Sequence, residues 1–307
     1  MKLKKVIAVA GVCAMVTGMI AGCGNNSSDT SADSSSDKTE ASSDWDASND
    51  ISVVSREDGS GTRGAFIELF GIEEKQGEEK VDMTTTEAQI TNSTSVMLTT
   101  VAGDDYAIGY VSLGALDDSV KAVKIDGAEA TAENVKSGDY KVSRPFNIAT
   151  KEGNESELAQ DFIAFILSKE GQAVVDENGY ISDDSAEPYA GTAPAGKIVV
   201  GGSSSVSPLM EKLIEAYKEN NPDAEIELQT TDSTTGMTSA IDGSYDIGMA
   251  SRELKDTELS EGLKAQVIAT DGIAVVVKKN NTIDDLSSDQ VKSIYTGETL
   301  TWDEVTK

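Results

Sequence analysis

Short apolar runs, most of them followed by loops rich in glycine and hydroxyl side chains, set the pattern of the chain after residue 50. Residues 51–54 and 198–200 predict buried strands, and residues 225–229 alternate as a further strand would. Apolar side chains recur at helical spacing in residues 66–70 and 209–217. Strands that alternate with helices predict an α/β fold, in which helices flank a twisted sheet.

Three of the polar loops stand where a strand ends and a helix is predicted to begin. They are residues 58–63 (Asp-Gly-Ser-Gly-Thr-Arg), with Arg56 just before them, residues 202–208 (Gly-Ser-Ser-Ser-Val-Ser-Pro) and residues 230–236 (Thr-Thr-Asp-Ser-Thr-Thr-Gly). Each loop alone is explained by turn formation and helix capping. Three helix N-termini with several hydroxyl donors, one of them with arginine, are together suited to hold a small oxyanion.

The first residues have the pattern of a signal peptide. Three lysines precede an apolar run over residues 6–20, which is too short to span a bilayer comfortably. The run ends in Ala21-Gly22-Cys23, which resembles the cleavage site of bacterial lipoproteins. We interpret residues 1–22 as a lipoprotein signal peptide and Cys23 as the acylated, palmitate-bearing first residue of the mature chain. An ordinary secretory signal with an incidental cysteine is the alternative.

Residues 23–50 are predicted to form a disordered tether behind this lipid anchor. They consist mostly of Ser, Asp, Thr, Asn and Ala, with a single aromatic residue, Trp45. Such a segment cannot bury enough apolar surface to offset the entropy cost of ordering it. Because Cys23 is the one cysteine of the mature chain, no disulfide within the chain is expected.

Charge and composition exclude several functional classes. The net charge of −29 makes nucleic acid and anionic lipid surfaces poor partners. Surface charges are screened over about 8 Å, so a recessed site can still bind an anion. The chain has no histidine and no Gly-x-x-x-x-Gly-Lys-Ser/Thr phosphate loop. Carboxylate pairs could still support hydrolysis, but we predict a binding protein with no catalytic residue, metal or cofactor.

Several segments resemble the phosphate-binding lipoproteins that deliver phosphate to Pst-type ABC importers. The segments that carry the resemblance most clearly are residues 54–66, 202–209 and 246–254, and supporting ones are residues 107–113, 143–145, 167–172, 269–274 and 301–302. The resemblance covers nearly everything after residue 50. It implies a periplasmic binding protein-like (type II) fold with two α/β lobes and the ligand in the cleft between them.

The order of these segments departs from the family, in which the serine-rich block usually comes first and the arginine loop follows only after the Asp-Gly-Ile-Ala strand and the tryptophan segment. Here the arginine loop comes first, and each block occurs once, so we interpret the chain as a circular permutation. Residues 182–197, which contain two prolines and two glycines, are the expected linker that joins the usual family termini. In this reading residues 50–144 with 272–307 form one lobe, and residues 145–271 form the other. The crossings near Arg144 and Asp271 would form the hinge.

The resemblance also implies ligand contacts at eight positions. They are Arg56, Ser60, Gly61 and Thr62 in one lobe and Ser204, Ser205, Ser233 and Ser251 in the other. Three further residues are expected to support them: Asp58, by orienting the guanidinium of Arg56, together with Asp232 and Arg252.

Selectivity between phosphate and sulfate is a separate question. Phosphate near neutral pH carries at least one proton and sulfate carries none, so a carboxylate acceptor favours phosphate and repels sulfate. Family members often place an aspartate where this chain has Ser251. The remaining candidates for the acceptor are Asp58, Asp232, Asp246 and Glu253, and the sequence does not rank them.

The function that these observations predict is capture of inorganic phosphate outside the cytoplasm and delivery to an ABC importer. The expected partners are phosphate, the permease subunits with their ATPase, and the membrane through the N-terminal lipid, for a monomer on the outer face of the cell membrane. Two alternatives stay open: a receptor for another tetrahedral oxyanion such as sulfate, and a surface phosphate sensor or adhesive lipoprotein.

Overall fold

The structure, a computed structural model, describes residues 45–77, 79–153 and 156–305. The predicted signal peptide, Cys23 and most of the predicted tether lie outside these residues. No helix within the described ranges is long and apolar enough to cross a membrane.

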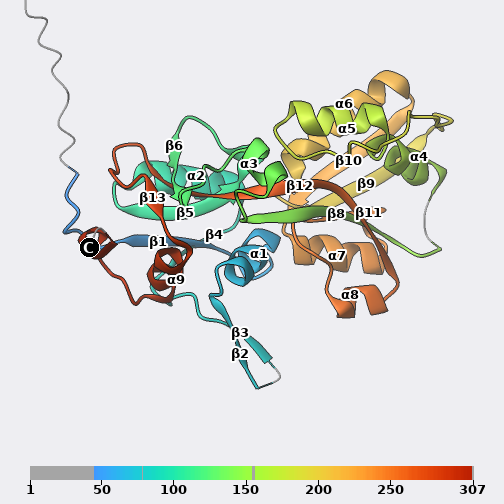
Figure 1. Cartoon of the computed structure of the whole chain (residues 1–307). Coiled ribbons are helices and arrows are strands. Elements are labelled where there is room, and N and C mark those ends of the chain that lie inside the picture. The colour runs from blue at the N-terminus through green and yellow to red at the C-terminus, as the bar shows by residue number, and fades with distance from the viewer. Residues whose placement is uncertain (1–44, 78, 154–155, 306–307) are drawn as a thin grey trace, which may run out of the picture. The chain divides into compact units, whose positions relative to one another are not determined.

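Strands and short helices alternate along the chain (Figure 1). The strands are β1 (Ser52–Arg56), β2 (Glu73–Gln76), β3 (Glu79–Asp82), β4 (Gln89–Thr91), β5 (Ala107–Ser112), β6 (Val120–Ala122), β7 (Lys124–Ile125), β8 (Ser143–Lys151), β9 (Gly196–Ser203), β10 (Ala224–Thr231), β11 (Ile247–Ala250), β12 (Leu263–Lys278) and β13 (Asp285–Leu286). The helices are α1 (Gly61–Leu69), α2 (Thr94–Gly103), α3 (Ala132–Ser137), α4 (Glu157–Ile166), α5 (Lys169–Glu177), α6 (Ser207–Asn220), α7 (Ser233–Asp242), α8 (Asp256–Ser260), α9 (Ser288–Thr296) and α10 (Trp302–Val305), with a 3₁₀ turn at Leu113–Ala115.

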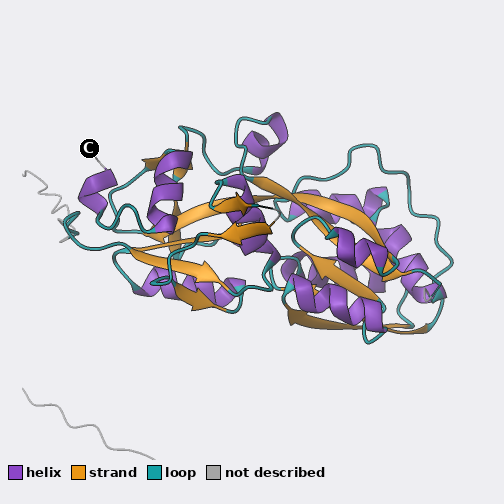
Figure 2. Ribbon diagram, turned by 90° about the horizontal axis from the view of Figure 1, so that it is seen from below, coloured by secondary structure: helices purple, strands orange, loops and turns teal. Residues whose placement is uncertain are grey.

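One mixed sheet runs through the described residues in the order β10-β9-β11-β8-β12-β5-β1-β4, with β6 beside β12. At one end β10, β9 and β11 are parallel, and at the other β5, β1 and β4 are parallel. The two long strands β8 and β12 pair antiparallel between these groups. Helices lie on both sides of the strands (Figure 2), which is the α/β arrangement that the sequence predicts.

Two main hydrophobic clusters form along this sheet. The first core cluster draws its buried residues from positions 54–142 and 273–305, and the second from positions 146–269. In the first, Phe66 stacks on Tyr110 and meets Tyr295 edge to face, whereas in the second Phe162 and Phe165 pack on Tyr217. Only β8 and β12 run from one cluster into the other, in the part of the chain that the structure describes.

A buried ion pair lies where β8 and β12 pass between the two clusters. The Arg144 guanidinium donates to the Asp271 carboxylate at 3.0 Å, and both side chains are almost completely buried. Ser112 donates to the other Asp271 oxygen at 2.9 Å. Burial raises the pKa of Asp271 to about 6, against the opposing effect of Arg144. The pair therefore ties the two connecting strands together at a point without solvent.

The ends of the folded part contact each other. Ile51 N–H donates to the Leu300 carbonyl at 2.7 Å, and Trp302 N–H donates to the Asn49 carbonyl at 3.3 Å. The Trp45 ring lies 6.1 Å from that of Trp302, and its Nε1–H donates to the Asp105 carbonyl at 3.0 Å. The sequence assigned Trp45 to the tether, but its ring has an aromatic partner from the far end of the chain. Ordered structure thus begins by residue 45 rather than after 50.

Residues 182–195, before β9, form no helix or strand. Asp161 of α4 holds this segment by accepting hydrogen bonds from Tyr189 Oη at 2.5 Å and from Thr192 N–H at 2.7 Å. Tyr217 Oη of α6 donates to the same carboxylate at 2.6 Å. One buried carboxylate therefore fixes the path of the segment over the second core cluster.

Candidate functional site

Four helices of eight or more residues begin close to one another, at the ends of β1, β4, β9 and β10. Three of them, α1, α6 and α7, start at the loops that the sequence singled out, and the fourth is α2. Thr62 in the first turn of α1 shares a hydrogen bond of 2.8 Å with Ser205, just before α6. Thr94 at the start of α2 lies 3.1 Å from the same serine hydroxyl. Unpaired N–H groups and positive dipole ends therefore converge there.

We call the side chains at this point the polar cluster. Its members are all buried and come from both of the sequence ranges that supply the two core clusters: Arg56, Ser60, Gly61, Thr62, Thr94, Ser203, Ser204, Ser205, Ser233 and Ser251. The structure thus brings together all eight residues predicted to contact a ligand. It adds Thr94 and Ser203, which the sequence analysis did not select.

Arg56 supplies the positive charge of the polar cluster. It is the last residue of β1 and 2% exposed. Its Nε and Nη2 donate to the two Glu57 carboxylate oxygens at 2.8 and 2.7 Å, and Nη2 also donates to Ser204 at 3.1 Å. A bidentate ion pair fixes the plane of the guanidinium. The geometry is therefore set before any ligand arrives.

The prediction that Asp58 orients Arg56 is wrong, because Glu57 occupies that role. The Asp58 side chain is 97% exposed and accepts from Arg63 Nη1 at 2.9 Å. Arg63 also donates to the Arg56 carbonyl at 2.7 Å and pairs with Asp82. Asp58 and Arg63 therefore stabilise the loop between β1 and α1 at its exposed side, while Glu57 contacts the Arg56 guanidinium.

Tyr110 of β5 holds the end of β1 through hydrogen bonds to Ser55 and Arg56. Its hydroxyl accepts from Arg56 N–H at 3.1 Å and bonds to Ser55 Oγ at 2.9 Å. Its ring stacks on Phe66 with a centroid distance of 3.9 Å. Burial raises the pKa of Tyr110 to about 12, so the phenol stays neutral at physiological pH.

Thr94 is a residue that the sequence analysis missed. It is 5% exposed, and its hydroxyl lies 3.3 Å from Ser204 and 3.5 Å from Arg56 Nη1. A signal for it existed, since residues 91–95 (Thr-Asn-Ser-Thr-Ser) precede a helical apolar pattern, as the other three polar loops do. That run contains no glycine or arginine, the two residue types that drew attention to the first loop.

Three serine hydroxyls from three different segments form a chain on the far side of the polar cluster. Ser203, at the end of β9, accepts from Ser205 N–H at 3.3 Å and donates to Ser251 at 2.9 Å. Ser251 lies 3.4 Å from Ser233, whose hydroxyl accepts from the Ser251 N–H at 3.1 Å. We call Ser203, Ser251 and Ser233 the serine relay.

Gly61 is the point where the first turn of α1 meets this relay. A Cβ atom at this position would lie 2.4 Å from Ser233 Oγ and 2.8 Å from Ser251 Oγ. Those distances are too short for any real contact, so glycine is required for the close approach. The N–H groups at the start of α1 can therefore come directly beside the two hydroxyls.

Gly61→Ala is expected to prevent this approach and to lower ligand affinity at least tenfold, while the free energy of unfolding changes little. A control is Gly64→Ala one turn later, where the added Cβ finds its nearest neighbour, Arg252 Cδ, at 3.9 Å. Titration calorimetry and urea unfolding of both variants would measure the two effects. Equal affinities of Gly61→Ala and the natural chain would contradict the close approach.

The other predicted supporting residues lie at the edge of the polar cluster. Asp232 caps α7 by accepting from Thr235 N–H at 2.9 Å, and its other oxygen accepts from the Thr235 hydroxyl at 2.5 Å. Arg252 points away and pairs with both oxygens of Glu258, at 2.7 and 2.9 Å. Asp232 therefore stabilises the start of α7, and Arg252 fastens α8 to the loop after β11.

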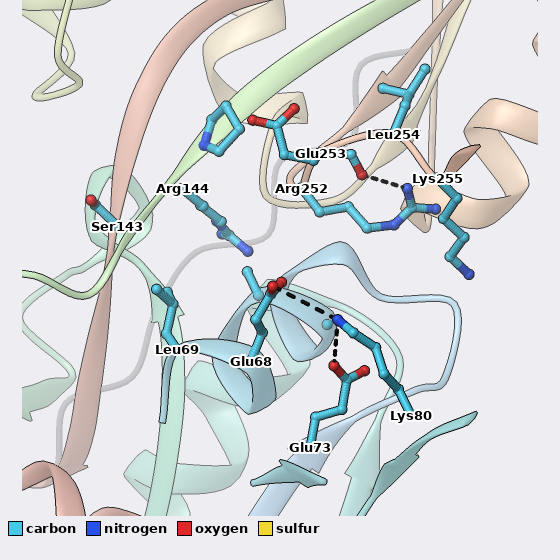
Figure 3. Close-up of a pocket in the computed structure, with 13 residues that line it drawn as sticks. Glu68, Leu69, Glu73, Lys80, Ser143, Arg144, Arg252, Glu253, Leu254 and Lys255 are labelled. Carbon is cyan, nitrogen blue, oxygen red and sulfur yellow. Dashed lines mark hydrogen bonds and ion pairs between the residues drawn. The ribbon is translucent and has the colours of Figure 1, made fainter. Parts of the chain in front are cut away.

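A pocket of about 460 Å³ opens beside the polar cluster, on the side where Arg252 lies (Figure 3). Glu68 and Leu69 of α1 form one wall, and residues 252–255 form the opposite wall. Lys80 in this pocket pairs with Glu73 at 2.8 Å. Most charged side chains of this pocket thus pair with opposite charges. The polar cluster differs, because it holds one arginine among many hydrogen-bond donors.

The groups of the polar cluster are mostly hydrogen-bond donors, which suits an anion. Its hydroxyls can donate, the helix N-termini add backbone N–H groups, and the guanidinium adds charge-assisted hydrogen bonds. No group of three or more acidic, histidine or cysteine side chains that could hold a metal ion occurs in residues 45–77, 79–153 and 156–305.

Comparison with known proteins identifies the family. The chain matches the PBP superfamily domain over residues 2–170 and 187–307. It is 57% identical, over all 307 of its residues and 99% of the relative's length, to a Streptococcus agalactiae protein named phosphate-binding protein PstS 2. A Streptococcus pneumoniae protein of the same name is 44% identical over 99% of this chain and all of its own length.

A solved structure gives the same result. The crystal structure of the phosphate-binding protein of a phosphate ABC transporter from Streptococcus pneumoniae TIGR4 matches 84% of this chain and 100% of its own length. The two are 46% identical, with a TM-score of 0.66. The family and the α/β binding-protein fold predicted from the sequence are confirmed. The chain belongs to the PBP superfamily and, within it, to the family of phosphate-binding proteins that these relatives represent.

Proposed function

We propose that this chain is an extracytoplasmic substrate-binding protein that captures inorganic phosphate and delivers it to an ABC importer. The observation that carries the proposal is the buried, pre-oriented Arg56 among hydroxyls and four helix N-termini. Hydrogen bonds to a charged ligand contribute about 1.5–3 kcal/mol each, and micromolar affinity requires about 8 kcal/mol. A handful of such bonds suffices. The names of the relatives, which include an ABC transporter component, support the same function.

In this proposal the two core clusters are the cores of two lobes, with boundaries as the sequence predicts: residues 50–144 with 272–307, and residues 145–271. The polar cluster would then lie in the cleft, and β8 and β12 would act as the hinge near Arg144 and Asp271. Contacts across the cleft, such as Thr62 to Ser205, support this arrangement. Phosphate would close the lobes because it binds the closed form better.

The circular permutation is part of the proposal. A permuted chain needs its new ends close together and a connection between the old ones. The bonds from Ile51 to Leu300 and from Trp302 to Asn49 meet the first condition. Residues 182–197 meet the second, because they cross the second core cluster without helix or strand until β9 begins at Gly196.

Lipidation at Cys23, a monomeric state, and contact with the permease subunits and their ATPase complete the proposal. The short apolar run before Cys23 supports the anchor. Mass spectrometry of the membrane-extracted chain would test it, because cleavage before Cys23 and added acyl chains have defined masses. An intact N-terminus would contradict the anchor without affecting phosphate binding.

Isothermal titration calorimetry with phosphate tests the central claim. We expect the chain from Asn25 onward, freed of bound ligand, to bind phosphate with micromolar or tighter affinity and a stoichiometry of one. Absence of heat at two temperatures, confirmed by equilibrium dialysis with labelled phosphate, would contradict the function. It would favour a sensor or adhesive protein that kept the fold.

A further inference from the structure

The pocket beside the polar cluster is lined by two parts of the chain that lie far apart in the sequence. Residues 64–80 of α1 and the β2–β3 hairpin form one wall, residues 252–255 form the other, and residues 143–145 lie between them (Figure 3). Its volume of about 460 Å³ is within the range of about 300–1,000 Å³ that ligand pockets usually have. A partner that enters it would therefore contact both sequence ranges at once.

Apolar side chains line part of this pocket. They are Ala65, Leu69, Pro145 and Leu254. Leu69 is 43% exposed, whereas Ala65 and Leu254 are nearly buried. Covering an exposed apolar wall is favourable, and such walls are typical of interaction sites. The pocket is thus suited to the hydrocarbon part of a side chain.

The wall that α1 and the hairpin form carries surplus negative charge. Lys80 pairs with Glu73 at 2.8 Å and lies 3.8 Å from Glu68, so two carboxylates share one ammonium group. The Glu68 side chain is 69% exposed. Residues 73–82 contain five acidic and two basic residues, a net charge of −3. A cation is therefore attracted to this wall.

The two arginines of the lining do not offset this surplus, because carboxylates outside the lining already pair with them. Arg252 pairs with both oxygens of Glu258, and Arg144 pairs with Asp271. The opposite wall, residues 253–255, adds one glutamate and one lysine, whose charges balance. The acidic side of the pocket is thus the side of α1.

The β2–β3 hairpin beside the pocket projects from the first core cluster (Figure 1). Within the described part of the chain its two strands pair only with each other. Asp82 at the end of β3 pairs with Arg63, which also donates to the Arg56 carbonyl. The hairpin is therefore open to a partner and is joined to the loop that carries the arginine of the polar cluster.

We infer that this pocket is the docking site for a basic side chain, arginine or lysine, presented by a membrane subunit of the importer. The inference rests on the proposed delivery of phosphate to an ABC importer. The apolar stem of such a side chain would lie along Leu69 and Leu254, and its charged head would reach Glu68. Because both sequence ranges line the pocket, the partner would contact the two proposed lobes together.

Uptake of labelled phosphate tests the inference in cells whose importer depends on this chain. Glu68→Lys reverses a charge of the acidic wall, and we expect uptake at low phosphate to fall at least tenfold, because like charges across an interface repel. Lysine suits the last turn of α1, so calorimetry should give a phosphate dissociation constant within about threefold of the natural one. Glu215→Lys on α6 is the matched control, because Glu215 is 70% exposed and also pairs with a lysine.

A second variant, Leu69→Gln, keeps the charge of the wall and makes it polar. It should also lower uptake without changing phosphate affinity. Normal uptake by both variants, present in the same amount as the natural chain, would overturn the inference and leave phosphate binding intact. An equal loss in Glu215→Lys would overturn it as well. A natural chain that binds phosphate and supports no uptake would overturn the delivery itself, and one that binds no phosphate would overturn the proposed function.

Discussion

Arg56→Ala is expected to lower the phosphate affinity by about 100-fold or more. The guanidinium is the one positive charge in the polar cluster, and its Nη1 group, which does not donate to Glu57, would bond to the ligand at about 1.5–3 kcal/mol for each hydrogen bond. A loss of 1.4 kcal/mol corresponds to a factor of ten in affinity. Calorimetric titration gives the affinity, and a urea unfolding curve shows whether the variant keeps its fold.

The interpretation of the Arg56→Ala affinity depends on Glu57, the ion-pair partner of Arg56. Removing Arg56 leaves this carboxylate unpaired and adds a negative charge next to the site, but its side chain is 22% exposed and can be hydrated. The double variant Arg56→Ala, Glu57→Gln separates the lost donors from the added repulsion. Arg63→Ala is the matched arginine control, because Arg63 pairs with Asp58 and Asp82 outside the cluster. A larger loss in Arg63→Ala than in Arg56→Ala would place the ligand elsewhere.

Asp271→Ala is expected to lower the free energy of unfolding by about 3–5 kcal/mol, the usual cost of leaving a buried charge without its partner. Arg144 has an exposure of 3%, and its Nη1 already has no hydrogen-bond partner. Without Asp271 the guanidinium would have no counter-charge between β8 and β12. Urea unfolding measures the loss.

Two further variants separate charge from packing. Replacing both residues by apolar ones, Arg144→Met with Asp271→Leu, should recover much of the stability, because it removes the need to bury charge. The pKa of Asp271 near 6 lies above the value of about 4 in an unfolded chain, so the folded state binds this proton more tightly. Its contribution is full below pH 4 and is lost as the pH rises through 6. Asp271→Asn should remove that part of the pH dependence; if it does not, another group titrates there.

The parts of the site that sequence could predict are those with local causes. Glycine and hydroxyl residues after a strand have turn and capping preferences that act within a few residues, so the loops before α1, α6 and α7 were predictable. Whether Glu57 or Asp58 pairs with Arg56 was not predictable. It depends on the backbone conformation at the end of β1, which decides which of the two side chains faces Arg56. The partnership of Arg56 with Ser204 spans 148 positions and has no local signal.

Trp45 illustrates the opposite error. Its neighbours in the sequence have a composition typical of disorder, from which we predicted a tether over residues 23–50. The position of Trp45 is instead fixed by ring contacts with Tyr106 and Trp302, which lie far away along the chain. Tertiary contacts of this kind override local composition, so the start of the fold could not be read from residues 23–50.

The contact between the two ends also has a mechanical meaning. If the chain is held to a membrane through Cys23, any pull on the anchor reaches the described residues at Trp45. The first structure to resist is the segment around Trp302, joined through Ala47 to Asp303 and Asn49 to Trp302. Trp302 belongs to the first core cluster and Trp45 and Ala47 pack on it, and none of these residues belongs to the polar cluster or to β8. A force on the anchor would therefore act first on the contacts between residues 47–49 and 302–303, and the polar cluster would bear little of it.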